Sequence, residues 1–479
     1  MPESEKKIKK ALNNSLKEGA AFSTMDGITS TYSTPFALAL GASNSEIGIL
    51  NSLPSLLMSI MQALSGGFIY RRGRKEIAVK FGLVHRLIWI PIILMPILFA
   101  NNLWLFIILF SISGTVISLA NTSWSCWMGG LVPEKIRGSY FGKRNMIQSA
   151  TSFLATIVAG YLLGLFNSQF GFSLVFLLAF SAGMVSYFYL NKVPPEAREK
   201  HARTHEHIGI FGFLKEIRKH RNFFPFTVHM SLLNFAVNMS SPFFTVYMLS
   251  VMNVGYEWYA IIVGAETLTR IVMMRYWGKL SDKYGDRNIM SLCNILIVFY
   301  PFLFLLSSNV YQLALVGIFS GFAWSGFDLT SFNYLLDITP PDRRPAYISN
   351  YKVAIGMALF LGPLVGGYLS QYFSTVSFLS FSGLQTLFIV SFILRFVFTA
   401  YGLPKLREVR ARRTMPITDV FLRAFATYPM KGITHNLTYI HNGLDWSERK
   451  IGARSRRLGR KVKKTLNEIY YTTPQDDSD

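Results

Sequence analysis

Residues 278–287 read GKLSDKYGDR and separate two apolar stretches, at 256–277 and 289–307. Glycine permits a tight chain reversal and close helix packing. An acidic side chain in such a turn can face the N-terminus of a neighbouring helix, and the cations can bind helix C-termini or lipid phosphates. We expect these contacts to hold a gate closed in one conformation. The alternative interpretation is an ordinary charged loop.

A weaker copy of this stretch follows the apolar run at 47–69. Tyr70 stands where the later copy has Asp282, so the first copy lacks the carboxylate contact. The predicted gate residues are Gly66, Arg71, Gly73 and Arg74 in the first copy, and Gly278, Asp282, Lys283, Gly285 and Arg287 in the second.

Other short matches in the two halves of the chain support a duplication. The segment VAGYL at 158–162 returns as VGGYL at 365–369, and Arg137 matches Arg344 at the same offset. Several matches in register indicate an internal repeat, since one alone would be chance.

The composition indicates what surrounds these stretches. Of 479 residues, 51% are hydrophobic, 15% aromatic and only 15% charged, whereas soluble proteins carry about 25% charged residues. So much apolar surface also excludes disorder. The sequence predicts an all-α membrane protein with twelve transmembrane helices in two pseudo-symmetric six-helix bundles. The stretches lie near 20–40, 47–69, 77–99, 103–127, 141–166, 172–191, 223–250, 256–277, 289–307, 310–336, 349–372 and 376–400.

Basic residues occupy every second connection between these stretches. Connections that hold Lys or Arg alternate with connections that hold none, and basic loops stay on the cytoplasmic side of a membrane. We therefore expect a multi-pass protein of the plasma membrane with both termini in the cytoplasm. The net charge of +22 then reflects orientation, and we expect no nucleic-acid partner. The base-free connections are 41–46, 100–102, 167–171, 251–255, 308–309 and 373–375.

Five parts follow from this pattern. They are a cytoplasmic N-terminus at 1–19, an N-terminal bundle at 20–191, a cytoplasmic linker at 192–222, a C-terminal bundle at 223–400 and a basic cytoplasmic tail at 401–479. Four histidines in the linker invite a metal interpretation, but without clustered cysteines or acids we favour a soluble linker and predict no metal site. The tail carries basic runs and an amphipathic segment, so we expect it to bind anionic lipid, with regulation or partner binding as the alternative.

The two gate stretches and the twelve apolar runs are similar to those of the major facilitator superfamily of secondary transporters. The resemblance covers residues 20–400. The resemblance implies that helices 1, 4, 7 and 10 line a polar path between two rocking bundles. Polar residues recur at helical spacing on those four stretches. The predicted cavity residues are Asp26, Ser30, Asn121, Trp124, Asn234, Asn238, Trp324 and Asp328.

Ionisable side chains at membrane depth cost about 2.5–3.5 kcal/mol each on insertion scales and mark functional sites. Asp328, near the middle of its predicted helix, is the first candidate for carrying substrate or a proton, with a structural hydrogen bond as the alternative. Asp26 is the second candidate, unless it lies close to the cytoplasmic interface.

Three further charges fall inside predicted helices. Glu266 and Arg270 stand four residues apart and can pair on one helix face, either as a coupling site or, as we favour, as a structural pair. Arg86, next to His85, is expected to extend its charge to the cytoplasmic side.

The eleventh stretch contains Gly362, Pro363, Gly366 and Gly367. This run resembles the antiporter signature of drug and proton exchangers, but that signature belongs in helix 5. Close helix contact and a kink explain the run without antiport, so we predict a helix-packing function.

No phosphate loop and no catalytic motif occurs in the sequence, so we predict neither an enzyme nor a cofactor. The favoured function is a monomeric secondary transporter that moves a small solute, with protons as the coupling ion. The alternatives are a drug and proton efflux antiporter, or a receptor that kept the fold and signals through its tail.

Overall fold

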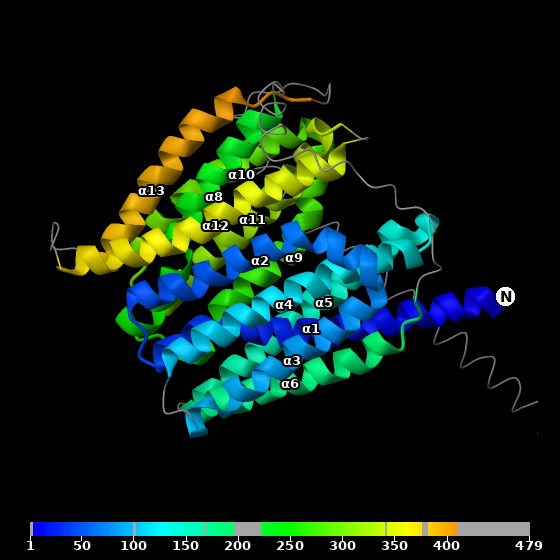
Figure 1. Ribbon diagram of the computed structural model, residues 1–479. Coiled ribbons are helices and arrows are strands. Elements are labelled where there is room, and N and C mark those ends of the chain that lie inside the picture. Colours follow the sequence, from blue (N-terminus) through cyan, green and yellow to red (C-terminus); the bar gives the residue numbers. More distant parts are fainter. Residues whose placement is uncertain are drawn as a thin grey trace, which may run out of the picture. The chain divides into compact units, whose positions relative to one another are not determined.

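Twelve helices of at least 20 residues account for most of the described chain (Figure 1). The computed structural model describes residues 3–98, 102–166, 169–195, 222–340, 343–375 and 382–409, all within a compact unit that ends at Arg413. Most of the linker and nearly all of the basic tail lie outside these ranges. The helices are α1 (Glu3–Ala39), α2 (Asn44–Arg72), α3 (Arg74–Leu98), α4 (Leu103–Leu131), α5 (Glu134–Leu165), α6 (Gln169–Asn191), α8 (Phe223–Val246), α9 (Tyr256–Tyr284), α10 (Asp286–Leu305), α11 (Val310–Ile338), α12 (Arg344–Thr375) and α13 (Gly383–Gly402).

Nine of the described helices are long and apolar enough to cross a membrane by length and composition. The other three helices of comparable length are α1, α2 and α9. The all-helical membrane fold is therefore confirmed. α1 begins at Glu3, well before the expected span, because Ala11 and Leu12 are buried in a cluster with Trp127 and extend the apolar packing.

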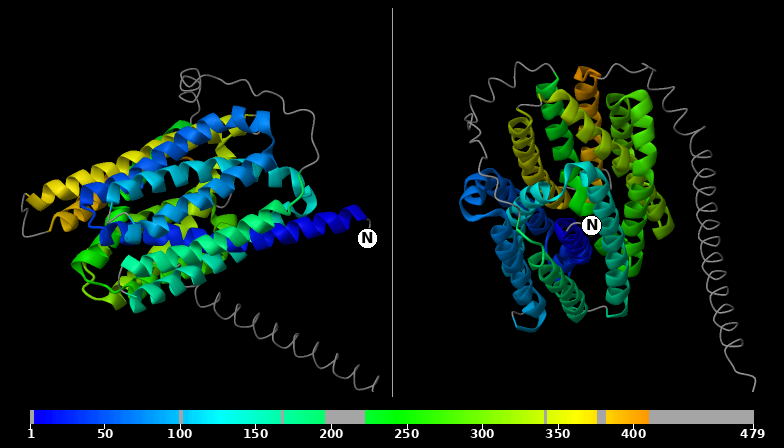
Figure 2. Two further views of the ribbon diagram at one scale, coloured as in Figure 1. Left: turned by 60° about the horizontal axis from the view of Figure 1, so that its bottom comes forward. Right: turned by 90° about the vertical axis from the view of Figure 1, so that its right-hand side faces the viewer.

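The helices form two bundles (Figure 2). In the N-terminal bundle, blue to blue-green, α1 packs on α5 and α6, and α3 packs on α4 and α6. In the C-terminal bundle, green to orange, α8 packs on α12 and α13, while α11 packs on α9 and α10. Each bundle therefore has its own helix contacts.

Two local features repeat between the bundles. Gly73 is the only residue between α2 and α3, with φ 85°, and Gly285 joins α9 to α10 with φ 89°. These left-handed conformations favour glycine at both turns. The Arg137 guanidinium donates to the Gly129 carbonyl at 3.0 Å, and that of Arg344 donates to the Leu336 carbonyl at 3.1 Å. Both arginines reach back by the same number of residues, as the duplicated sequence predicts.

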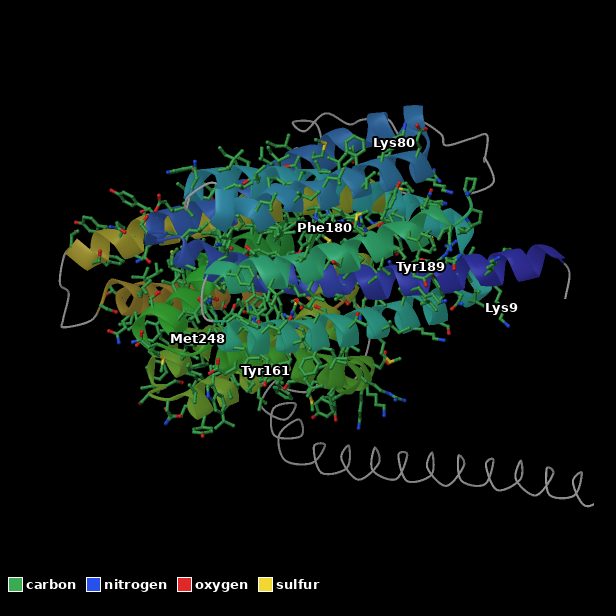
Figure 3. All side chains as sticks on the ribbon, turned by 90° about the horizontal axis from the view of Figure 1, so that it is seen from below. Lys9, Lys80, Tyr161, Phe180, Tyr189 and Met248 are labelled. Carbon is green, nitrogen blue, oxygen red and sulfur yellow. The ribbon has the colours of Figure 1, made fainter. Side chains whose placement is uncertain are left out.

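The bundles contact each other through α2 with α12 and through α5 with α9. A methyl group added at Gly48 would lie 2.6 Å from the Pro363 carbonyl oxygen, and one at Gly160 would collide with Ala260. These contacts lie near the base-free connections 41–46 and 251–255. Figure 3 shows Met248 toward this end of the helices and Lys9 and Tyr189 toward the other.

The glycine run of α12 lies at two of these helix contacts. Gly362 and Gly366 approach the backbone of α8, where a methyl group at Gly362 would come within 2.9 Å of the Phe235 carbonyl oxygen. Gly367 approaches α2, near the Asn44 carbonyl, and Pro363 lies inside the helix. Because these glycines have no side chain, α12 packs closely against α8 of its own bundle and α2 of the other.

Candidate functional site

A cavity of about 390 Å³ lies between the bundles, directly inside their contact. Helices α1, α2, α8, α9 and α12 all contribute to its lining. Most of the lining side chains carry a hydroxyl or an amide group. These polar groups are Ser30, Thr31, Thr34, Asn51, Ser55, Asn238, Ser241, Thr245 and Tyr259.

The N-terminal bundle holds its polar groups against helix backbone. The Asn51 Nδ2 donates to the Ile47 carbonyl at 2.9 Å and to the Thr34 hydroxyl at 3.4 Å. The Ser30 hydroxyl donates to the Asp26 carbonyl at 2.6 Å, so Asp26 lies one helical turn from the cavity. These local bonds fix the side-chain directions and leave other polar capacity for a solute.

The C-terminal bundle supplies the opposite wall. The Asn238 Nδ2 donates to the Asn234 carbonyl at 2.8 Å. The Tyr259 hydroxyl lies 3.4 Å from the Thr245 hydroxyl and donates to the Thr31 carbonyl of the other bundle at 3.2 Å. Tyr259 is buried and thus joins the two bundles at one side of the cavity.

A second cavity of about 480 Å³ lies between α2, α4 and α12. Asn121 and Ser125 from α4 line it, together with Ser59 from α2 and Lys352 from α12. Lys352 and Asn121 are exposed side chains. This cavity therefore brings the predicted residue Asn121 to the surface between the bundles, but not to the cavity that contains Asn238.

Asp328 and Arg270 form an ion pair across α11 and α9, with 3.2 Å between Asp328 Oδ2 and Arg270 Nη2. Their side chains are 47% and 39% exposed. The Arg270 guanidinium also lies 5.9 Å from the Trp324 ring centre. The ion pair that the structure shows for Arg270 is with Asp328 of α11, and the predicted pairing with Glu266 along α9 stays a prediction.

The N-terminal bundle contains a buried ion pair that the sequence did not predict. Arg144 Nη2 lies 2.7 Å from Glu18 Oε2, and both side chains are almost fully buried. The Arg144 guanidinium lies 4.0 Å from the Trp124 ring centre. Glu18 belongs to the segment expected to be a cytoplasmic N-terminus. The extension of α1 brings it between the helices.

Arg86 is also buried in this bundle. Its guanidinium donates to the Gly82 and Gly183 carbonyls and, at 2.8 Å, to the Ser186 hydroxyl. The expectation that Arg86 extends to the cytoplasmic side is therefore wrong, since only 1% of the residue is exposed. Helix carbonyls and a hydroxyl replace water around its charge.

The second gate segment contacts the chain that follows α13. The Arg287 Nε donates to the Leu406 carbonyl at 2.7 Å, and its backbone N–H donates to the Glu408 carboxylate at 3.1 Å. The same carboxylate covers Gly285. These two gate residues bind their own bundle in this structure. Of the other predicted gate residues, Gly66 and Arg71 lie in α2, Gly73 lies between α2 and α3, Arg74 begins α3, and Gly278, Asp282 and Lys283 lie in α9.

The predicted cavity residues fall into separate groups. Ser30 and Asn238 line the first cavity, and Asn234 supports Asn238 from one turn away. Trp324 and Asp328 surround Arg270, whereas Trp124 covers Arg144. Of the four helices named by the resemblance, only the first and seventh, α1 and α8, line the first cavity, and α2, α9 and α12 complete it.

The polar contribution of α2 is also visible in the sequence. Asn51, Ser55, Ser59 and Gln62 recur at helical spacing along this helix. The first two line one cavity and the last two line the other. A polar stripe on α2 thus connects the two cavities.

The sequence matches a family. A sequence model described as Major Facilitator Superfamily matches residues 19–274 and 259–447. The uncharacterized MFS-type transporter YqjV of Bacillus subtilis is 26% identical over 189 residues, which is 39% of this chain and 45% of that protein. A multi-drug resistance efflux pump PmrA homolog of Lactococcus lactis is 23% identical over 351 residues, 70% of this chain and 82% of that protein.

The fold has solved counterparts as well. A crystal structure of a variant of the nucleoside transporter NupG superposes with a TM-score of 0.66 at 13% sequence identity, over 82% of this chain and all of that one. Identity this low shows the shared fold alone. Since the family model covers well over half of the sequence, the chain belongs to the Major Facilitator Superfamily and is a multi-pass membrane transporter.

Proposed function

We propose that this secondary transporter moves a small polar solute by alternating access and couples the movement to protons. The observation that carries the proposal is the polar cavity at the meeting point of the two bundles. A solute bound there contacts both bundles, so their relative movement exposes it to one side of the membrane and then to the other.

The distribution of contacts supports a conformation open to the cytoplasm. The bundles touch near the base-free connections, which the positive-inside rule assigns to the outside. Asp26, Asn121 and Asp328 are exposed, although all three lie within helices of the bundles. In this orientation both termini are cytoplasmic, and we place the protein in the plasma membrane.

Asp328 is the proposed proton carrier. Its partial exposure lets protons reach the carboxylate, and protonation would remove the attraction to Arg270. Arg270 would then be free to pair with Glu266, four residues away on the same helix. Asp26, one turn from Ser30, is a second carboxylate for proton binding. Proton binding would thereby change the contacts between α9 and α11.

Reconstituted vesicles test this function. An acid exterior should drive accumulation of the substrate in vesicles with the native chain, and Asp328→Asn should abolish the accumulation while exchange of labelled substrate continues. Glu46→Gln is a matched control, because Glu46 is a carboxylate of a helix cap outside the cavities. Equal pH-driven accumulation in Asp328→Asn and native protein would refute Asp328 as the carrier.

Export is the second candidate direction. The similarity to a protein named as a multi-drug efflux pump favours it. Vesicles with an acid interior would separate the two directions, because the outgoing protons drive solute into the vesicle through an exchanger and carry it out through a symporter. Loss of substrate from acid-loaded vesicles without proton movement would contradict both.

We further propose that the protein acts as a monomer and that its basic tail binds anionic lipid. Removal of residues 410–479 should lower the amount of phosphatidylglycerol that co-purifies with the protein from mixed micelles. Equal co-purification with the full and shortened chains would refute the lipid contact.

A further inference from the structure

The lining of the central cavity is polar but uncharged. In the described chain, the side chains that line the cavity include no Asp, Glu, Lys, Arg or His. Asp26 lies one turn beyond Ser30, Glu266 lies one turn beyond Val263, and Arg270 pairs with Asp328 of α11, a helix that does not line the cavity. A charged solute in this cavity would lose hydration without gaining a counter-charge there.

The lining is equally unsuited to an apolar solute. Nine of its side chains carry hydroxyl or amide groups, against two aliphatic side chains and two prolines. A lipophilic molecule would strip water from these groups and return no hydrogen bonds, which is costly for each group left unpaired. A solute with several hydrogen-bonding groups of its own replaces that water.

The cavity lining contains one amide side chain from each bundle. Asn51 of α2 and Asn238 of α8 each donate through Nδ2 to a carbonyl of their own helix. Each carboxamide oxygen then remains as an acceptor for a ligand hydroxyl or N–H. Because the two residues belong to different bundles, a relative movement of the bundles changes the contacts of a solute bound to both.

We propose that the central cavity binds an uncharged solute rich in hydroxyl or amide groups, such as a sugar, polyol or nucleoside, between Asn51 and Asn238. This inference rests on the proposed transport function and specifies its substrate class. The volume of about 390 Å³ lies in the range of small-molecule sites. The charged groups outside the lining then serve coupling, and recognition is left to neutral hydrogen bonds.

Binding to the purified full-length protein tests the class. Thermal unfolding is followed with D-glucose, myo-inositol and uridine as neutral probes, and with tetraphenylphosphonium and benzoate as charged probes. At least one neutral probe should raise the melting temperature in a saturable way. Failure of all three neutral probes, or stabilisation by a charged probe in preference to them, overturns the proposal.

Variants locate the binding. Asn51→Ala and Asn238→Ala should each weaken the neutral probe about tenfold, as expected for one lost hydrogen bond to the solute. Gln371→Ala is the matched control, since Gln371 is an exposed carboxamide of α12 outside the lining of the cavity. Unchanged affinity in both alanine variants, or an equal loss in the control, would overturn the assignment.

Transport of the bound probe separates this inference from the function on which it rests. Binding of a neutral probe that never crosses the vesicle membrane would support the cavity chemistry and refute the transport proposal. Proton-driven movement of benzoate or tetraphenylphosphonium would do the reverse.

Discussion

Each bundle places an arginine beside a tryptophan and pairs it with an acid, but the two pairs differ in contact with water. In the N-terminal bundle, Arg144 and Glu18 are 7% and 6% exposed. In the C-terminal bundle, Arg270 and Asp328 are 39% and 47% exposed. A buried charge depends on its partner, whereas a partly exposed one can exchange its partner for water. The buried pair is therefore suited to stabilise the N-terminal bundle, and the partly exposed pair is suited to change its contacts during transport.

Breaking the buried pair should give the largest effect. Glu18→Met leaves the Arg144 charge uncompensated inside the bundle, and we expect the free energy of unfolding to fall by about 3–5 kcal/mol. Reversible unfolding in mixed detergent micelles measures the change. A loss below about 1 kcal/mol would show that water or another group compensates Arg144, and would break the comparison.

Replacing both partners should restore most of the stability. In Glu18→Met with Arg144→Met, neither charge remains to be desolvated, so we expect a stability within about 2 kcal/mol of the native chain. The same unfolding assay completes the double-mutant cycle. A double variant as unstable as Glu18→Met alone would mean that the pair contributes through packing and not through charge.

The exposed pair should respond in function rather than in stability. Asp328→Asn is expected to cost less than about 1 kcal/mol of unfolding free energy, because solvent already screens the pair. In native protein, acidification should weaken the attraction to Arg270 as the carboxylate takes up a proton, and the variant should lose this pH response. Binding of the neutral probe at two pH values measures it. A variant that retained the native response would exclude Asp328 as its source.

A surface pair sets the lower limit of the comparison. Lys80 and Glu76 lie 2.7 Å apart but are 71% and 56% exposed. Glu76→Gln should change the unfolding free energy by at most about 0.5 kcal/mol. A larger loss would show that exposure does not rank these pairs, and would weaken the argument drawn from the other two.

The sequence predicted the helices well because apolar length and glycine turns are local signals. The structure confirms helices at all twelve expected stretches, and the Gly73 and Gly285 turns repeat. Contacts between helices were harder to predict. The spacing of Glu266 and Arg270 allows a pair along α9, but the ion pair that packing forms is between Arg270 and Asp328 of α11. Spacing along one helix cannot reveal which neighbouring helix competes for a side chain.

The cavity residues also divide into those that local sequence patterns predict and those that only the packing of helices reveals. Polar stripes on α1 and α8 predicted Ser30 and Asn238, whereas the equally regular stripe on α2 lies on a helix outside the four that the resemblance implies. Glu18 escaped for a different reason. It precedes the apolar run of α1, and only tertiary packing buries it against Arg144.

The chain after α13 is bound to the gate turn of the C-terminal bundle, so a label placed there follows the movement of that bundle. Leu406 and Glu408 are fastened to Arg287, and the Arg407 carbonyl accepts a bond of 2.8 Å from Tyr334. A fluorophore attached at Val409 would therefore travel with the C-terminal bundle. Paired with a second dye at Lys80 of the other bundle, it forms a molecular ruler for the opening and closing of the transporter during turnover.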